Sequence, residues 1–192
     1  MKEIVKECIE KSICAKNKLL NDDIIIELIS TVSQEIIQCY KNGNKVCICG
    51  NGGSAADAQH FAAELVGRFL LERKALPAIA FTTDSSILTS IGNDYGYDNV
   101  FERQVEGLVK KGDIFVVIST SGNSNNLLKA LDKANSMGAV TVGLLGKNGG
   151  KCKEKCKYPL IIDWENTPNI QECHITIIHT ICKIVEEAMY EE

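Results

Sequence analysis

The sequence predicts an α/β protein with a parallel sheet covered by helices on both faces. Five short apolar runs lack the polar alternation of a half-exposed strand, which is typical of strands buried on both faces. These runs are residues 45–50, 77–81, 113–119, 139–145 and 158–162. Longer stretches with helical spacing of apolar residues lie between them. This alternation of strand and helix favours parallel strands joined by crossover helices.

The size and composition of the chain suit a single domain. It has 192 residues, of which 45% are hydrophobic and 24% charged, enough for one continuous core. We find no repeat of 20 to 50 residues and no low-complexity tract. We therefore expect one domain over residues 1–192, with N-terminal helices in 1–42 and an α/β core in 45–190.

Charge and cysteine content narrow the class of protein. The net charge is -4 and no basic block is present, which disfavours a nucleic-acid partner. No apolar run reaches the roughly 18 residues that a membrane span needs. The nine cysteines are scattered through apolar segments, as expected for reduced, mostly buried thiols, and we expect structural rather than zinc-binding roles for them. The charged N-terminus lacks the apolar stretch of a secretion signal, so the predicted location is the cytoplasm.

Helices are predicted at both ends of the chain. Residues 2–42 have apolar positions at helical spacing, interrupted near Asn21 to Asp23, where an N-cap can start a second helix. Residues 167–192 predict one long helix, with Thr167 as its N-cap and Pro168 at the first helical position. That helix carries two of the three histidines.

A glycine-rich loop follows the first strand. Its residues, Gly50 to Ser54, permit close backbone approach to a ligand, and the new helix offers N–H groups to an anion. The pattern is neither a Walker A loop nor a G-x-G-x-x-G fingerprint, so no nucleotide cofactor is expected. A tight turn without a ligand explains these glycines equally well.

A hydroxyl-rich loop follows the third strand. Ser119, Thr120, Ser121 and Ser124 can donate to a phosphate without a cation, although an ordinary N-cap turn is the alternative. If the two strands are neighbours, both loops meet at one edge of the sheet. Together they predict a polar crevice for a phosphorylated, hydroxyl-rich small molecule.

Histidine and acidic residues form a candidate acid/base group. His60 and Glu64 are four residues apart and therefore on one helix face, where a simple surface pair is the alternative. Gln171 and His179 lie eight apart, near one face of the last helix. His174 lies between them on another face of the helix. We expect it to pack in the core with its hydrogen bonds satisfied.

Four segments resemble the sugar isomerase (SIS) superfamily and, within it, the phosphoheptose isomerase family. They are residues 49–69, 80–106, 119–131 and 170–186, in the same order as in the family. The resemblance implies a single SIS domain with a five-stranded parallel, flavodoxin-like sheet. It also implies a homotetramer and conversion of sedoheptulose 7-phosphate to D-glycero-D-manno-heptose 7-phosphate, the entry to nucleotide-activated heptoses.

The resemblance also assigns residues. Substrate contacts fall on Asn51, Gly52, Gly53, Ser54, Glu64, Asn93, Asp94, Ser119, Thr120, Ser121, Ser124 and Gln171. The catalytic pair falls on Glu64 and His179. A zinc ion, as bound by several relatives, would be held by His60, Glu64, Gln171 and His179.

The isomerisation suits these residue types. A carboxylate can remove the proton next to the carbonyl, a histidine can move protons among the oxygens, and zinc can polarise the carbonyl. Glu64 is thus the expected base and His179 the expected proton shuttle. A carboxylate bound to zinc is a poorer base, so the two roles of Glu64 compete.

Two alternatives remain open. Relatives commonly have Thr-Ala-Arg where this chain has Thr167-Pro168-Asn169, and the missing arginine leaves room for another ketose phosphate as substrate. Some SIS proteins are non-catalytic adaptors that bind the bacterial replication initiator protein. Adaptors typically lack the catalytic pair, whereas this chain has Glu64 and His179.

Overall fold

The five predicted strands form one parallel sheet. The structure, a computed structural model, describes residues 1–190. The strands are β1 (Val46–Gly50), β2 (Ala78–Ala80), β3 (Ile114–Ser119), β4 (Val140–Gly146) and β5 (Tyr158–Ile162). Their order is β2-β1-β3-β4-β5, and every neighbouring pair is parallel. This is the flavodoxin-like order, so the predicted fold class is confirmed.

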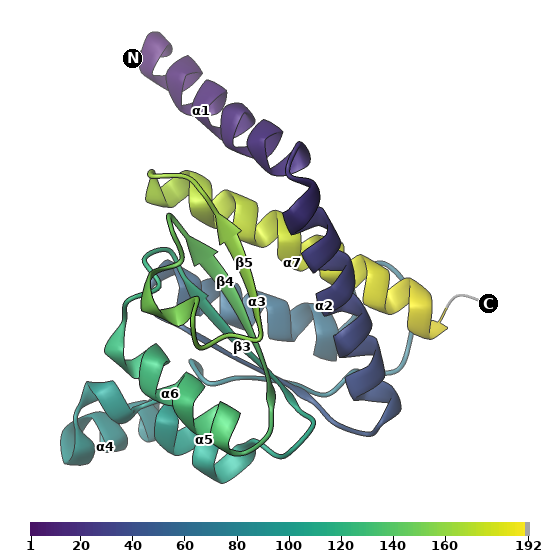
Figure 1. The fold of residues 1–192 in the computed structure, drawn as a ribbon, viewed down its shortest axis with the longest axis vertical. Helices are drawn as coiled ribbons and strands as arrows, with labels where there is room; N and C mark the ends of the chain where they lie inside the picture. Colours follow the sequence, from purple (N-terminus) through teal and green to yellow (C-terminus); the bar gives the residue numbers. More distant parts are fainter. Residues whose placement is uncertain (191–192) are drawn as a thin grey trace.

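Helices cover both faces of the sheet (Figure 1). They are α1 (Lys2–Leu20), α2 (Asp23–Lys41), α3 (Gly53–Val66), α4 (Ser85–Tyr95), α5 (Glu102–Leu108), α6 (Asn125–Ser136) and α7 (Thr167–Tyr190), with short 3₁₀ turns η1 (Tyr97–Asn99) and η2 (Gly150–Cys152). None of these helices is long and apolar enough to cross a bilayer.

Each face of the sheet has its own hydrophobic core. Alternate residues of β3 point to opposite faces: Val116 packs with α2, α3 and α7, whereas Phe115 and Val117 pack with α5 and α6. All five residues of β1 and all six of β3 are buried. The apolar runs therefore lack alternation because both of their faces are covered, as predicted.

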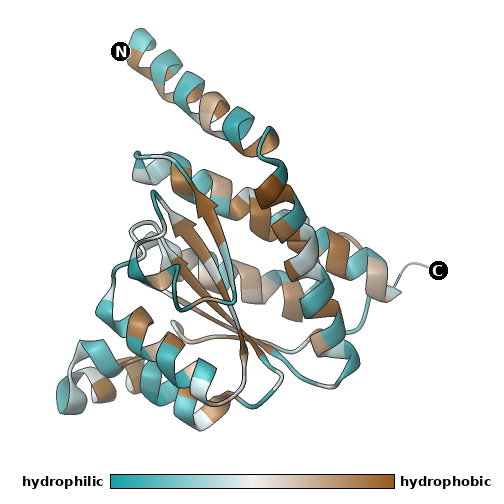
Figure 2. Ribbon diagram, viewed as in Figure 1, coloured by the Kyte–Doolittle hydropathy of each residue, from teal (hydrophilic) through white to brown (hydrophobic). Residues whose placement is uncertain are grey.

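The N-terminal helices are also confirmed, including the cap between them. Asp22 Oδ1 accepts hydrogen bonds from the N–H groups of Ile24 and Ile25, which starts α2. Helix α1 extends away from the sheet (Figure 1) and carries exposed apolar residues along its length (Figure 2).

The start of α7 differs from the prediction by one residue. The helix begins at Thr167 itself, and the Ile170 N–H donates to the Asn166 carbonyl, so Asn166 holds the position predicted for Thr167. Pro168 is the second helical residue, where a missing N–H is equally harmless. The predicted end at residue 192 lies outside the described residues.

Candidate active site

The glycine-rich loop, residues 50–54, is called the glycine loop below. It brings β1, α3 and α7 together. Gly52 has a positive φ of 56°, which favours glycine. A Cβ placed on Gly53 would lie 2.2 Å from Nε2 of Gln171, so a side chain there would displace the Gln171 amide. The first turn of α3 and the first turns of α7 are therefore in direct contact at the loop.

The side chain of Asn51 is held by hydrogen bonds with residues of α6 and η1. Its side-chain amide forms two hydrogen bonds with the amide of Asn126 on α6, of 2.9 and 3.0 Å. Tyr97 Oη also donates to Asn51 Oδ1 at 3.3 Å. We did not predict Asn126 or Tyr97 from the sequence, because neither carries a motif of its own.

The hydroxyl-rich loop after β3, residues 119–124, is called the serine loop below. It is held by hydrogen bonds of its own side chains and by one from η2. Ser119 Oγ accepts from the Gly122 N–H at 3.0 Å, and Ser121 Oγ accepts from the Asn123 N–H at 3.3 Å. The Cys152 N–H donates to the Gly122 carbonyl at 2.9 Å. Ser124 occupies the N-cap position of α6, but its side chain makes no capping bond. Its hydroxyl is therefore available to a ligand.

The two loops enclose a small polar pocket of about 90 Å³. It is lined by Asn51, Ser54, Ile118, Ser119, Thr120, Ser121 and Ser124. β1 and β3 are neighbours, and the order of the strands reverses between them, where ligands bind in open α/β sheets. The prediction that the loops meet at one edge of the sheet is confirmed.

His60, Glu64 and His179 also lie close together, farther along α3 from the glycine loop. His60 Nε2 lies 2.8 Å from Glu64 Oε1 and 3.5 Å from His179 Nε2. The Glu64 side chain is 23% exposed and can be reached from solvent. Phe69 packs against the His179 ring, with the ring centroids 5.5 Å apart. The structure thus gathers these three side chains from two helices into one acid/base cluster.

The acid/base cluster of His60, Glu64 and His179 has a donor set that fits zinc. One ligand atom from each residue lies within 4.8 Å of the others. Two imidazole nitrogens and one carboxylate oxygen are a set found in catalytic zinc sites. The three ligand atoms face one another across the contact between α3 and α7, so one cation could contact all of them.

Gln171 lies at the other end of the contact between α3 and α7. Its amide packs against Gly53, and the eight residues to His179 correspond to a rise of about 12 Å along the helix. A role beside the glycine loop therefore agrees with its position, and its role as a fourth zinc ligand stays a prediction.

Two further predicted residues lie on the surface of α4. Asn93 and Asp94 are exposed, and the Asn93 amide donates to Asp94 Oδ1 at 2.8 Å. Within residues 1–190, no hydrogen bond links either of them to the two loops. Their predicted substrate contacts are untested by this geometry.

Asp57 was missed by the sequence analysis. It lies on α3 three residues before His60, and its buried Oδ2 has no hydrogen-bond partner among the described residues. Burial raises the pKa of its carboxyl, and the nearby His60 opposes that rise. Its spacing from Gly53, His60 and Glu64 at four, three and seven residues was the available signal.

His174 is buried, as predicted, and its hydrogen bonding is weak. Its exposed fraction is 0%, and neither ring nitrogen has a hydrogen-bond partner in the described part of the chain. Burial lowers its pKa to about 4, so the ring is neutral near pH 7. The predicted packing role agrees with this burial, and the backbone of Leu145 beside the ring partly opposes the fall in its pKa.

Comparison with known proteins identifies the family. The SIS domain family model matches residues 21–146. A phosphoheptose isomerase from Clostridium acetobutylicum is 54% identical over 192 residues, which are 100% of this chain and 98% of the relative. This chain belongs to the phosphoheptose isomerase family. A phosphoheptose isomerase family structure from Neisseria gonorrhoeae superposes with a TM-score of 0.91 at 42% identity, covering 97% of this chain and 98% of that one. Another family structure, from Francisella tularensis, gives a TM-score of 0.92 at 36% identity, covering 96% and 97%.

Proposed function

We propose that this chain is an isomerase that converts sedoheptulose 7-phosphate to D-glycero-D-manno-heptose 7-phosphate, the first step toward nucleotide-activated heptoses. The observation that carries the proposal is the acid/base cluster, in which His179 of α7 meets His60 and Glu64 of α3, the helix that also begins at the polar pocket. The family membership of the chain supports the same reaction.

The spacing along α3 agrees with a seven-carbon substrate. Ser54 lines the pocket and His60 begins the acid/base cluster, and their six-residue separation corresponds to about 9 Å of helix. Six carbon–carbon bonds of about 1.5 Å each extend over roughly 8 Å. A phosphate bound by the serine loop would thus leave C1 and C2 near His60, where the acid/base cluster begins.

Protons move in a balanced cycle between these groups and the sugar. Glu64 takes a proton from C1 of the ketose, which forms the enediolate, exchanges this proton with solvent, and then gives a proton to C2. His179 carries the hydroxyl proton of O1 to O2, so that the aldehyde forms at C1. The acid and the base end each turnover in their original protonation states.

A zinc ion would be held by His60, Glu64 and His179; Gln171, the predicted fourth ligand, would have to move from its place beside Gly53 to reach it. When bound, it would supply Lewis acidity for the carbonyl and enediolate oxygens. Metal analysis of the purified protein, before and after treatment with a chelator, tests this part of the proposal.

The pocket and the surface suggest the remaining contacts. Ser119, Thr120, Ser121 and Ser124 would bind the phosphate, since hydroxyls and the N-terminus of α6 converge there. Asn51, Gly52, Gly53, Ser54 and Gln171 would contact the sugar, with Asn93 and Asp94 reaching it from α4.

The nine free thiols agree with a cytoplasmic location.

We also propose a homotetramer. Helix α1 exposes Ile4, Val5, Ile9 and Ile13, each more than half accessible. Apolar residues gathered on one exposed helix are typical of an interaction surface, and a second copy of the chain would cover them.

An isotope experiment tests the reaction. Sedoheptulose 7-phosphate incubated in deuterated water with the protein should yield the aldose with solvent deuterium at C2. A panel of shorter ketose phosphates, assayed in parallel, tests whether the substrate is another sugar, as the missing arginine allows. Turnover of none of them would contradict an isomerase and favour the adaptor function instead.

A further inference from the structure

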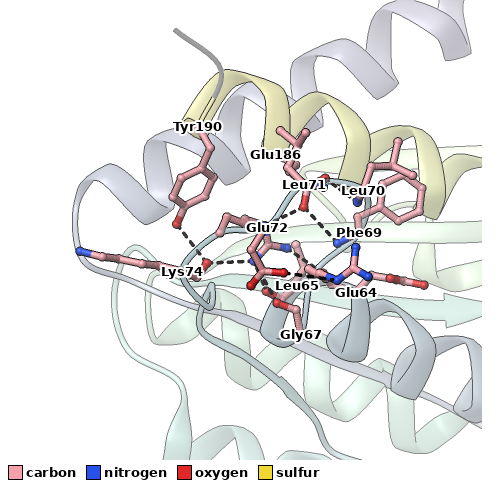
Figure 3. A network of polar contacts seen from close by, with 12 residues as sticks. Glu64, Leu65, Gly67, Phe69, Leu70, Leu71, Glu72, Lys74, Glu186 and Tyr190 are labelled. Carbon is pink, nitrogen blue, oxygen red and sulfur yellow. Dashed lines mark hydrogen bonds and ion pairs between the residues drawn. The ribbon is translucent and has the colours of Figure 1, made fainter.

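A buried ion pair joins α7 to the segment that follows α3. Arg73 Nε lies 2.8 Å from Glu186 Oε1, and the two side chains are 1% and 2% exposed. Burying two charges is costly unless their remaining donors and acceptors are also satisfied. Here both side chains have backbone partners. Figure 3 shows Glu186 beside Phe69, Leu70 and Leu71.

The Arg73 guanidinium binds the end of α3. Nη2 donates to the Glu64 carbonyl at 2.8 Å, and Nη1 donates to the Leu65 carbonyl at 2.9 Å. These carbonyls belong to the last turn of the helix and have no partner within it. The cation also interacts favourably with the negative end of the helix dipole. Arg73 therefore fixes the backbone of Glu64 itself.

The Glu186 carboxylate binds the turn after α3. Oε1 accepts from the Phe69 N–H at 3.0 Å, and Oε2 accepts from the N–H groups of Leu70 and Leu71 at 2.6 and 2.8 Å. Burial alone would raise the pKa of Glu186, but these three N–H groups and Arg73 outweigh it and lower the pKa. Glu186 is therefore ionised near pH 7.

These contacts lead directly to the acid/base cluster. Arg73 holds the Glu64 backbone, and Glu186 holds Phe69, whose ring packs against His179. Glu186 also follows His179 by seven residues, two turns along the same face of α7. We infer that Arg73 and Glu186 are positioning residues that set the separation of Glu64 and His179 for the reaction proposed above.

The first test is Glu186→Gln, which keeps the shape of the side chain and removes its charge. The turnover number with sedoheptulose 7-phosphate should fall about 10- to 100-fold, as expected for a small misplacement of reacting groups. The KM should change little, because the phosphate pocket lies at the other end of α3. Zn²⁺ binding to the metal-free protein, measured against a competing chelator, should weaken about 10- to 100-fold.

Arg73→Lys is the second variant. It keeps a positive charge for Glu186 but cannot reach the Glu64 and Leu65 carbonyls with a planar fork. The same loss of turnover with little change in KM is expected. This variant decides the question if Glu186→Gln does not fold.

Asp113→Asn is the matched control. Asp113 is also a buried carboxylate, 2% exposed, which pairs with Lys45 and accepts from the Lys45 and Lys110 N–H groups. It precedes β3, at the opposite edge of the sheet from the two loops. The control should lower the Tm and leave turnover and Zn²⁺ affinity unchanged.

The outcomes separate this inference from the proposed function. Unchanged turnover and Zn²⁺ affinity in a destabilised Glu186→Gln, or failure of both variants to fold at 20 °C, would make the pair purely structural and overturn the inference. If the wild type is inactive, the proposed function fails, and Zn²⁺ affinity alone then decides whether the pair positions the acid/base cluster.

Discussion

Glu64 is held by its backbone and left free at its side chain. Its carbonyl accepts from Arg73, whereas its carboxylate meets only His60 among the hydrogen-bond partners in residues 1–190. A general base needs this combination, because it must be placed accurately and still change its protonation state. The backbone of Glu64 is therefore held in place, and its carboxylate is available where the substrate would bind.

Replacing Glu64 by Gln should separate chemistry from binding. The variant keeps the shape of the side chain but cannot take a proton, so turnover should fall about 10² to 10⁴-fold. Incorporation of deuterium from solvent should stop, while binding of the phosphorylated substrate, measured by calorimetry, should persist. Glu72→Gln is the control, because the Glu72 side chain is 93% exposed. Near-normal exchange in Glu64→Gln would rule out Glu64 as the base.

His174 makes the stability of the protein depend on pH. Its pKa is about 4 in the folded state and 6.5 in the unfolded state, so the unfolded state binds more protons between these values. Stability should therefore fall as the pH drops from 6.5 to 4, by on the order of 3 kcal/mol in total. Urea unfolding at several pH values measures this. His174→Phe should reduce the slope, and an unchanged slope would assign it to other groups.

The sequence predicted which residues carry the chemistry better than it predicted their surroundings. His60 and Glu64 were found because they are four residues apart on one helix. Arg73 and Glu186 were not, because they are 113 residues apart and no local pattern links them. The weak hydrogen bonding of His174 was missed for the same reason, since it depends on how α7 packs against Leu145 of β4.

At the scale of elements, helix α6 links the strand core to the serine loop. Its buried Leu127 and Leu131 pack on one face of the sheet, and Ser124 begins the helix at the pocket. Apolar spacing was enough to predict this helix and the strands. The exact first residue of α7 was not predicted, because Asn166 and Thr167 are both suitable caps.

Removing two hydroxyls from the serine loop should weaken phosphate binding. Ser121→Ala and Ser124→Ala should each cost about 1.5 to 3 kcal/mol of affinity for a charged ligand. The KM for sedoheptulose 7-phosphate and the Kd for inorganic phosphate measure this loss. Ser136→Ala, at the exposed end of α6, is the control. Unchanged constants in the double variant would place the phosphate elsewhere.

At the scale of the whole molecule, the sheet determines where the site lies. Parallel strands place their carboxyl ends at one edge, so the glycine and serine loops had to meet there once β1 and β3 were neighbours. That adjacency followed from the family resemblance and not from the apolar pattern alone. The contact of α3 with α7 depends on the complete fold, which is why the position of Gln171 beside Gly53 was not predicted.

The exposed face of α1 should assemble the protein. Val5, Ile9 and Ile13 follow one another at four-residue intervals, and the last two are 54% and 53% exposed. Burying each isoleucine against a partner would contribute about 1.5 to 3 kcal/mol. Ile9→Glu with Ile13→Glu should therefore dissociate the proposed tetramer, whereas Lys6→Glu on the same helix should not. Sedimentation equilibrium, referred to a chain of 21.0 kDa, distinguishes these states. A wild-type protein that sediments as a stable, active monomer would contradict the assembly.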